Sequence, residues 1–393
     1  MRVLYFADIR FPLERANGIQ TMETCHALAQ RGHTVHLVVK PDTHSPARDP
    51  FDFYGLPTTR SLIIERANAP KGAGIIARVG YMSFVFGRAF GKARADVIIT
   101  RDLGVAAALL KIPAGLRAPV VYESHGYAPD VASALPDLVA TAKPASASKL
   151  KRLANREAEV WRDAAGYVTI TRALADELQR RFGSRQHLAV VPDGMRPPAT
   201  PVAPSGSAPV AGYAGHLYAW KGVDVLLQAI AQVAEVKGLI VGGHSAEPDL
   251  ARVKRLADDL RITDRVTFTG LVAPAAVPAH LASATMLVLP NPASAISTHF
   301  TSPLKLFEYM AAGRPIIASD LPAIREVLRH GENALLADPG NADAIAGAMR
   351  TLIADPALAA RLARTAASDA NDYTWPRRAE RLEALLAAVV QAA

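Results

Sequence analysis

Short apolar runs alternate with segments of helical periodicity along most of the chain. In the first half the runs are rich in β-branched and aliphatic residues, which predicts strands, and segments such as 18–30 and 173–182 have the spacing of helices. The predicted strands of this half are Val3–Ala7, Val35–Val39, Val97–Thr100, Val120–Ser124, Tyr167–Thr171 and Leu188–Val191. Strands and helices that alternate in this way predict an α/β fold with a doubly wound parallel sheet.

The pattern stops at residues 196–209, which contain five prolines and show no periodicity. Such a segment is typical of a linker between domains. The strand–helix pattern then restarts, with predicted strands at Val210–Ala214, Leu239–Val241, Val266–Thr269, Met286–Leu289 and Ile316–Ala318. We therefore expect an N-terminal domain over 1–195, a linker over 196–209 and a C-terminal domain over 210–372. An amphipathic helix in 373–393 is expected to pack back toward the N-terminal domain.

Composition narrows the function classes. The only cysteine of the 393 residues, Cys25, excludes an internal disulfide and any multi-cysteine metal site, which fits a reducing compartment. The N-terminus resembles a strand and not a signal peptide, and no apolar run reaches about 18 residues. A cytoplasmic location is expected. The net charge of +8 suits a phosphorylated small molecule or an anionic membrane surface. Nucleic acid is disfavoured, because the basic residues are scattered and not interleaved with aromatics.

The segment Lys71–Lys92 is mostly apolar and contains interspersed basic residues. It predicts either a core helix of the first domain or an interfacial helix in peripheral contact with an anionic membrane. We favour the core helix, because the glycines of this segment weaken an autonomous helix.

Residues 298–319 carry the most informative pattern. A polar loop precedes a short helix that contains Glu308, the helix ends at Gly313, and a buried-looking strand follows. A loop that enters a helix beside a strand end offers backbone N–H groups and the helix dipole to a phosphate. A carboxylate further along the helix is well placed for the hydroxyl pair of a ribose.

A second pattern is found in residues 212–227, where a strand, a loop and a helix follow one another. Lys221 precedes the start of this helix, so its ammonium group and the free amides can face one anion together. Cations held in such a position would stabilise the charge that develops on a departing diphosphate.

These two segments, in this order and about 90 residues apart, resemble those of the retaining glycosyltransferases of family 4. The resemblance covers essentially the whole chain. It implies the GT-B fold, in which two Rossmann-like domains face each other across a cleft. It also implies that Lys221 and His216 stabilise the donor diphosphate, with His216 in the place of the family's usual arginine, and that Glu308 binds the ribose.

The chain departs from the family at Phe300, where a glutamate normally contacts the donor sugar. A phenylalanine side chain cannot accept a hydrogen bond, which leaves the identity of the sugar open. The resemblance places the diphosphate near the backbone amides of Leu304 and Lys305. The lost sugar contact is open to several neighbours, and donor-binding candidates in this loop are Thr298, His299, Thr301 and Ser302.

In the N-terminal domain, the resemblance implies that the turn at Asn17 and Gly18 approaches the donor phosphates, since glycine and asparagine tolerate left-handed backbone. His125 follows a predicted strand and occupies the family's position for a histidine near the reacting carbon. The strand-end pair Arg101 and Asp102 is a further candidate, with a purely structural role equally open.

Backbone groups are implied to meet the nucleotide in the C-terminal domain. The donor-binding candidates here are Gly215, Gly243, Gly270, Leu271 and Val272. Recognition through the backbone leaves UDP, GDP and ADP as alternatives. We expect no metal and no cofactor, since no Asp-x-Asp pair lies in a convincing loop and the nucleotide sugar is itself a substrate.

The leading hypothesis is a metal-independent, retaining hexosyltransferase of glycan or glycoconjugate biosynthesis. Its partners would be a nucleotide-sugar donor and an acceptor that is a sugar, a lipid-linked sugar or a small molecule. Two alternatives stay open: a catalytically silent paralogue that binds a nucleotide sugar, and an epimerase or phosphorylase with the same fold.

Overall fold

The computed structural model describes residues 1–393 except 69–73, 92–93, 139–142, 197–207, 245–246 and 295–303. The chain forms two compact units, of which the first comprises Met1–Ala132, Ala145–Gly194 and Trp375–Ala393. The second comprises Ser133–Pro144 and Met195–Thr374. Helix α5 (Ala128–Leu138), expected to lie wholly in the N-terminal domain, crosses the boundary, because its residues from Ser133 on group with the second unit.

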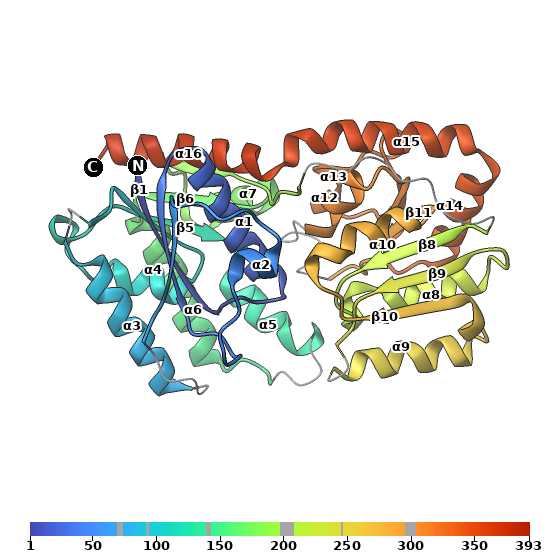
Figure 1. The fold of residues 1–393 in the computed structure, drawn as a ribbon, viewed down its shortest axis with the longest axis horizontal. Helices are drawn as coiled ribbons and strands as arrows, with labels where there is room; N and C mark the ends of the chain where they lie inside the picture. The colour runs from blue at the N-terminus through green and yellow to red at the C-terminus, as the bar shows by residue number, and fades with distance from the viewer. Residues whose placement is uncertain (69–73, 92–93, 139–142, 197–207, 245–246, 295–303) are drawn as a thin grey trace. The chain divides into compact units, whose positions relative to one another are not determined.

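The first unit is built on a seven-stranded parallel sheet with the strand order β3-β2-β1-β4-β5-β6-β7 (Figure 1). Its strands are β1 (Arg2–Arg10), β2 (Thr34–Lys40), β3 (Leu62–Arg66), β4 (Val97–Thr100), β5 (Val120–Ser124), β6 (Gly166–Thr169) and β7 (Leu188–Val190). The order reverses between β1 and β4, and ligands of doubly wound sheets bind beyond the carboxyl ends of strands at such a point.

Helices cover both faces of this sheet. They are α1 (Ala16–Gln30), α2 (Pro50–Tyr54), α3 (Ile75–Ala89), α4 (Leu103–Leu109), α6 (Ala147–Asp163), α7 (Arg172–Phe182) and α16 (Trp375–Gln391). The last of these comes from the end of the chain and packs against α1 and the neighbouring strands β6 and β7. The C-terminal helix therefore completes the first unit.

The second unit repeats the architecture with six parallel strands in the order β10-β9-β8-β11-β12-β13. The strands are β8 (Val210–Ala214), β9 (Lys237–Val241), β10 (Val266–Gly270), β11 (Met286–Leu289), β12 (Ile316–Ser319) and β13 (Leu335–Ala337). Its helices are α8 (Val223–Ala231), α9 (Pro248–Asp259), α10 (Val277–Ser283), α12 (Leu304–Ala311), α13 (Pro322–Arg325), α14 (Ala342–Ala354) and α15 (Pro356–Asp369).

Successive residues of β8 point to opposite faces, and each face has its own core. Tyr213 belongs to the cluster that α8, α9 and α14 cover, and Ala214 belongs to the cluster around α10 and α12. Strands that are buried on both faces read as continuous apolar runs, which explains why the sequence marks them so clearly. None of the helices in the described part of the chain has the length and apolar character needed to cross a membrane.

Candidate functional site

Glycine backbones meet at the carboxyl ends of β8, β9 and β10 in the second unit. Gly215, Gly242 and Gly270 follow or end these strands with φ values of 134°, 123° and 71°. The amide of Gly242 donates to the carbonyl of Gly270 over 3.0 Å, and a Cβ atom at Gly242 would lie 2.3 Å from the carbonyl oxygen of Gly215. A side chain is thus excluded at Gly242, where the backbones at the ends of β8, β9 and β10 come together. Gly243 adjoins it, and Leu271, which is half exposed, and Val272 follow β10.

Lys221 lies at the start of α8. A single 3₁₀ turn, Ala219–Lys221, ends at Gly222, whose left-handed backbone (φ 76°) begins the helix. The ammonium nitrogen lies 3.6 Å from the centroid of the Trp220 ring. No ion pair of Lys221 occurs among the described residues, and burial lowers its pKa to about 7. The site therefore holds a desolvated cation at the point where a helix begins.

A second lysine, Lys305, is buried in the first turn of α12. Its ammonium nitrogen donates to the hydroxyl of Tyr213 over 2.8 Å and lies 4.0 Å from the centroid of that ring. Burial lowers the pKa of Lys305 well below its usual range, and the charge of Lys221 lowers it further, while Glu308 acts in the opposite direction. The two ammonium groups are therefore close enough to repel each other, and an anion between them would relieve that repulsion.

Glu308 is half-buried on α12. This helix ends as the sequence predicts, with Gly313 in the left-handed conformation (φ 63°). Leu304, whose amide is implied to meet the diphosphate, is the first residue of the helix. The other candidates of this loop, Thr298, His299, Thr301 and Ser302, lie outside the described residues, as does Phe300.

His216 follows Gly215 directly after β8. Its imidazole stacks on the ring of Tyr218 with a centroid distance of 5.0 Å and an interplanar angle of 6°. Its Nδ1 lies 3.5 Å from Glu247 Oε2, and the Tyr218 hydroxyl donates to Glu247 Oε1 over 3.0 Å. The imidazole is therefore oriented by a ring on one side and by a carboxylate on the other.

In the first unit, His125 lies just beyond the carboxyl end of β5. Its Nε2 is 2.7 Å from Glu123 Oε1. Burial and the nearby charge of Arg101 lower the pKa of His125, so the ring is neutral at pH 7. Because a carboxylate only accepts hydrogen bonds, Nε2 carries the ring proton, and Nδ1 is left as an acceptor. The structure thus assigns one tautomer to the candidate catalytic histidine.

Glu123 is held in turn by Arg378 of α16. The guanidinium donates to both carboxylate oxygens over 2.7 Å, and the two side chains are 0% and 1% exposed. Arg378 also donates to the hydroxyl of Thr24 and to the carbonyl of Val191. Burial alone would raise the pKa of Glu123, but Arg378 and His125 hold it well below its usual range. One arginine thereby joins α1, β5, α16 and the residue that follows β7 behind His125.

The left-handed turn expected at Asn17 and Gly18 is wrong, while their approach to the donor phosphates stays a prediction. Both residues lie in the first turn of α1 and neither has a positive φ, so they do not form a left-handed turn. A Cβ atom at Gly18 would lie 2.2 Å from the carbonyl oxygen of Leu13 and 2.5 Å from the hydroxyl of Tyr54. The glycine is required by packing within the first unit itself.

Arg101 and Asp102, which follow β4, have different roles. The carboxylate of Asp102 accepts from the amide of Val105 and caps α4. Arg101 donates to the side-chain oxygen of Gln20 over 2.6 Å, and Gln20 donates to Glu123. Asp102 is therefore structural, and Arg101 belongs to the network behind His125.

Sequence reasoning missed the role of Arg378, although a signal was present. The apolar side of the C-terminal helix contains Trp375, Ala379 and Leu382, which are buried, and Arg378 falls on the same side. A charge inside an apolar stripe requires a buried partner. The sequence gives no indication that this partner is Glu123, 255 residues away. In the described part of the chain, no group of three or more His, Cys, Asp or Glu side chains could hold a metal ion.

Comparison with known proteins adds to this geometry. A protein-family model described as "Glycosyl transferase 4-like domain" matches residues 18–194, and one described as "Glycosyl transferases group 1" matches residues 208–355. A curated relative, D-inositol 3-phosphate glycosyltransferase of Rhodococcus erythropolis, is 30% identical over 180 residues, which are 43% of this chain and 39% of the relative. The chain thus spans about two fifths of the length of that relative.

Solved structures resemble the chain over its full length. Sucrose-phosphate synthase from Thermosynechococcus elongatus has a TM-score of 0.78 at 18% identity and covers 100% of both chains. The Anabaena protein HepE in complex with UDP-glucose has a TM-score of 0.75 at 18% identity, with 99% of this chain and 100% of that chain covered. These likenesses show that the two Rossmann-like units have the GT-B fold.

Proposed function

Because the chain belongs to the glycosyltransferase group 1 family, we propose that it transfers a hexosyl group from a nucleoside-diphosphate sugar to an acceptor hydroxyl. The proposal includes retention of configuration at the anomeric carbon and independence of a metal ion. The observation that carries it is the position of two lysines at helix starts, Lys221 before α8 and Lys305 in the first turn of α12, with the Lys305 side chain beside Gly215 at the end of β8.

A departing diphosphate carries negative charge, which favours the protonated, positively charged form of both lysines. Cations that are already in place stabilise this charge without reorganisation of solvent, which is the largest contribution in many transfer reactions. Lys221 contributes from the start of α8. His216, oriented by Glu247 and Tyr218, would donate a second hydrogen bond to the diphosphate. No metal ion is needed for this role, because side chains and amides supply the positive potential.

Glu308 would bind the ribose of the donor. It is half-buried on the helix that also carries Lys305, and its charge acts on that lysine. A carboxylate at this place could accept hydrogen bonds from the diol of a ribose. That HepE was solved with UDP-glucose supports a uridine nucleotide as the first donor to test.

His125 would act on the sugar and not on the nucleotide. Its neutral ring presents Nδ1 as an acceptor, while Nε2–H is directed to Glu123. Such an acceptor can bind a sugar hydroxyl but cannot donate a charge-assisted bond to a phosphate. We assign it to the orientation of the transferred sugar.

The test uses the full chain with UDP-glucose and GDP-mannose, and follows the slow transfer of the sugar to water by mass spectrometry. Lys221→Ala should lower kcat by about two to three decades. Proton NMR of the sugar first released should show the α anomer from an α-linked donor, and EDTA should leave the rate unchanged. Binding of donors without any turnover would instead identify a silent nucleotide-sugar-binding paralogue, and release of the β anomer would contradict retention.

A further inference from the structure

Arg378 of α16 is a buried arginine whose hydrogen-bonding capacity is fully used. Its side chain is 1% exposed. Its donors reach five acceptors, which are the Thr24 hydroxyl, the carbonyls of Val191 and Pro192, and both carboxylate oxygens of Glu123. Because a guanidinium group has five N–H donors, each donor of Arg378 has an acceptor. The group is therefore held in one orientation, with its positive charge beside Glu123.

The carboxylate of Glu123 connects this charge with His125. Its Oε1 accepts from Arg378, from the side-chain amide of Gln20 and from His125 Nε2. Arg101 donates to the side-chain oxygen of Gln20, so the amide N–H of Gln20 is directed to Glu123. An oxygen that accepts from three donors carries no proton of its own. Nε2 of the neutral His125 ring therefore keeps its proton, and Nδ1 stays an acceptor.

Other ionisable groups face Glu123 from the elements packed around it. They are Tyr5 of β1, Cys25 of α1, Arg101 after β4 and Asp193 after β7. Burial raises the pKa of Tyr5 and Cys25, so both are neutral at pH 7, and it raises the pKa of Asp193 as well. Burial also acts to raise the pKa of Glu123, and Arg378 opposes it more strongly than any other charge does.

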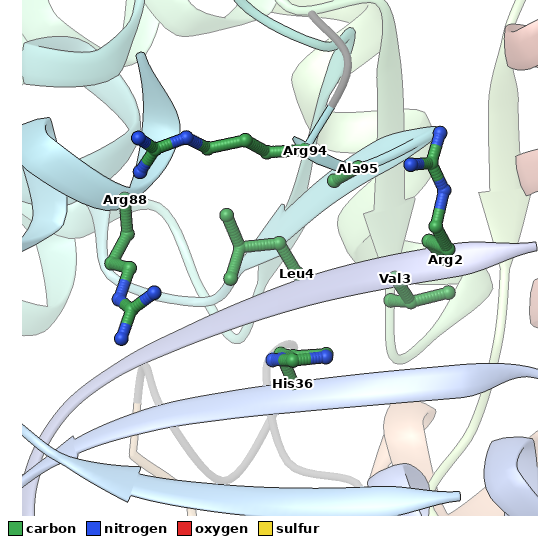
Figure 2. Close-up of a pocket in the computed structure, with 7 residues that line it drawn as sticks. All are labelled: Arg2, Val3, Leu4, His36, Arg88, Arg94 and Ala95. Carbon is green, nitrogen blue, oxygen red and sulfur yellow. The ribbon is translucent and has the colours of Figure 1, made fainter. Parts of the chain in front are cut away.

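The arginines at the start of β1 differ from Arg378 in exposure. Figure 2 shows three of them around a cavity of about 320 Å³, whereas His125 lies beyond the carboxyl end of the parallel strand β5. The guanidinium of Arg2 pairs with Asp96 there, and 52% of its side chain is exposed. An exposed pair contributes little, but removal of one partner of a buried pair leaves the other charge uncompensated. The influence on the candidate site therefore belongs to Arg378.

We propose that Arg378 is a positioning residue, which acts through Glu123 to keep the ring proton of His125 on Nε2 and Nδ1 as the acceptor for a sugar hydroxyl. This inference rests on the role proposed above for His125. Without the guanidinium, the buried pair of Glu123 and His125 takes up a proton from solvent more readily. A protonated Glu123 can donate to Nε2 and so favour the ring with its proton on Nδ1, and a proton taken up by the ring itself also goes to Nδ1. In both cases the acceptor for the sugar is lost.

The alternative is that Arg378 only fastens α16 to the first unit through its bonds to Thr24 and Val191. The double variant Arg378→Met/Glu123→Gln separates the two roles. It removes both buried charges, so part of the stability returns. A neutral amide can both donate and accept, however, and no longer fixes the tautomer of His125. The kcat of the double variant should stay low if Arg378 positions His125, and should recover with stability if its role is only structural.

The first measurement is 15N NMR of the histidine rings of the full chain without substrate, with His125 assigned by comparison with His125→Gln. Ring nitrogens with and without a proton differ in chemical shift. The unmodified chain should show the His125 proton on Nε2 throughout the neutral pH range. Arg378→Met and the double variant should show protonation of Nδ1, whereas Arg378→Lys, which keeps the positive charge, should retain the proton on Nε2.

The second measurement is kcat for transfer of glucose from saturating UDP-glucose to water, as a function of pH. Relative to the unmodified chain, Arg378→Met should lose about ten-fold in kcat per pH unit below the raised pKa of the pair. Arg378→Lys should remove this dependence. The matched control is Arg117→Met, because Arg117 is also buried but donates to the carbonyls of Ile112 and Ala118. The control should lower kcat equally at every pH, if at all, and leave the His125 signals unchanged.

Urea denaturation should verify that each variant is folded under the assay conditions, and the double variant provides the test if Arg378→Met is not. The proposal is overturned if the His125 proton stays on Nε2 in the variants that lack Arg378. It is also overturned if kcat recovers with stability in the double variant, or if Arg117→Met shows the same pH dependence as Arg378→Met. Because the NMR measurement uses no substrate, a chain that transfers no sugar but shows the expected change of tautomer would refute the proposed function and leave the positioning of His125 by Arg378 supported.

Discussion

The pKa of Lys221 makes a quantitative prediction about nucleotide binding. With a pKa of about 7 in the free protein, about half of the molecules carry the ammonium charge at pH 7. A diphosphate beside Lys221 favours the charged form and raises this pKa in the complex. Binding must then take up about half a proton at pH 7 through Lys221 alone.

The sign of the pH dependence follows from the same argument. Below pH 7 the free lysine is already charged, so Lys221 adds no pH dependence there. Above pH 7 the lysine must take up a proton from solution when the nucleotide binds. The association constant should therefore fall about fifty-fold between pH 7 and pH 9. This loss continues until the pH reaches the raised pKa of the complex.

The measurement is titration calorimetry with UDP in buffers of different ionisation enthalpy, with Lys221→Arg as the matched variant. An arginine stays charged over the whole range, so the variant should lose the half proton of uptake and the steep fall above pH 7. Protons taken up by UDP itself cancel in the difference between the two proteins. Lys305→Met serves as the control for the second lysine, whose pKa is also lowered. Equal proton uptake by the unmodified chain and Lys221→Arg would refute the reasoning.

Three further predictions concern the network and the turns around the site. Arg378→Met should lower the free energy of unfolding by about 3–5 kcal/mol, because it leaves the buried charge of Glu123 without its partner. The double variant Arg378→Met/Glu123→Gln should recover part of this loss. Urea denaturation measures both free energies, and additive effects of the two substitutions would contradict the pairing. Glu308→Gln should weaken UDP by about ten-fold to a hundred-fold, as expected for a hydrogen bond to a charged group, so unaltered calorimetric affinity of the folded variant would exclude the ribose contact. Gly222→Ala should destabilise by more than about 2 kcal/mol, since a Cβ there meets a carbonyl oxygen at 1.8 Å, whereas Gly313→Ala, in open space with similar φ, should cost only about 1 kcal/mol; equal melting temperatures would contradict this difference.

Most of the strands could be read from the sequence because each is a continuous apolar run. Val97–Thr100, Val120–Ser124 and Met286–Leu289 are predicted with the bounds that the structure shows. The two strands that the sequence analysis does not predict, β3 and β13, lie at edges of their sheets. In β3 the apolar run is interrupted by exposure, as at Ile63, which is 43% exposed, and β13 has only three residues, so neither forms a long buried apolar run.

The sequence by itself determined the local parts of the candidate site. Lys221 before a helix start, Glu308 on α12 and the left-handed Gly313 are properties of short segments, whose conformation follows from propensity and capping. The identity of the family was likewise carried by two such segments. The contacts that these residues make with distant parts of the chain could not be predicted from short segments.

Only the tertiary structure decided the long-range pairings. Arg378 meets Glu123, Lys305 meets Tyr213, and Glu247 meets His216 from elements far apart in the chain. A buried charge can find its partner on any of several elements packed around it, and the sequence states the need for a partner without naming it. The same holds for α3, since periodicity predicts an apolar helix, but only packing against the first sheet decides which of its apolar side chains are covered.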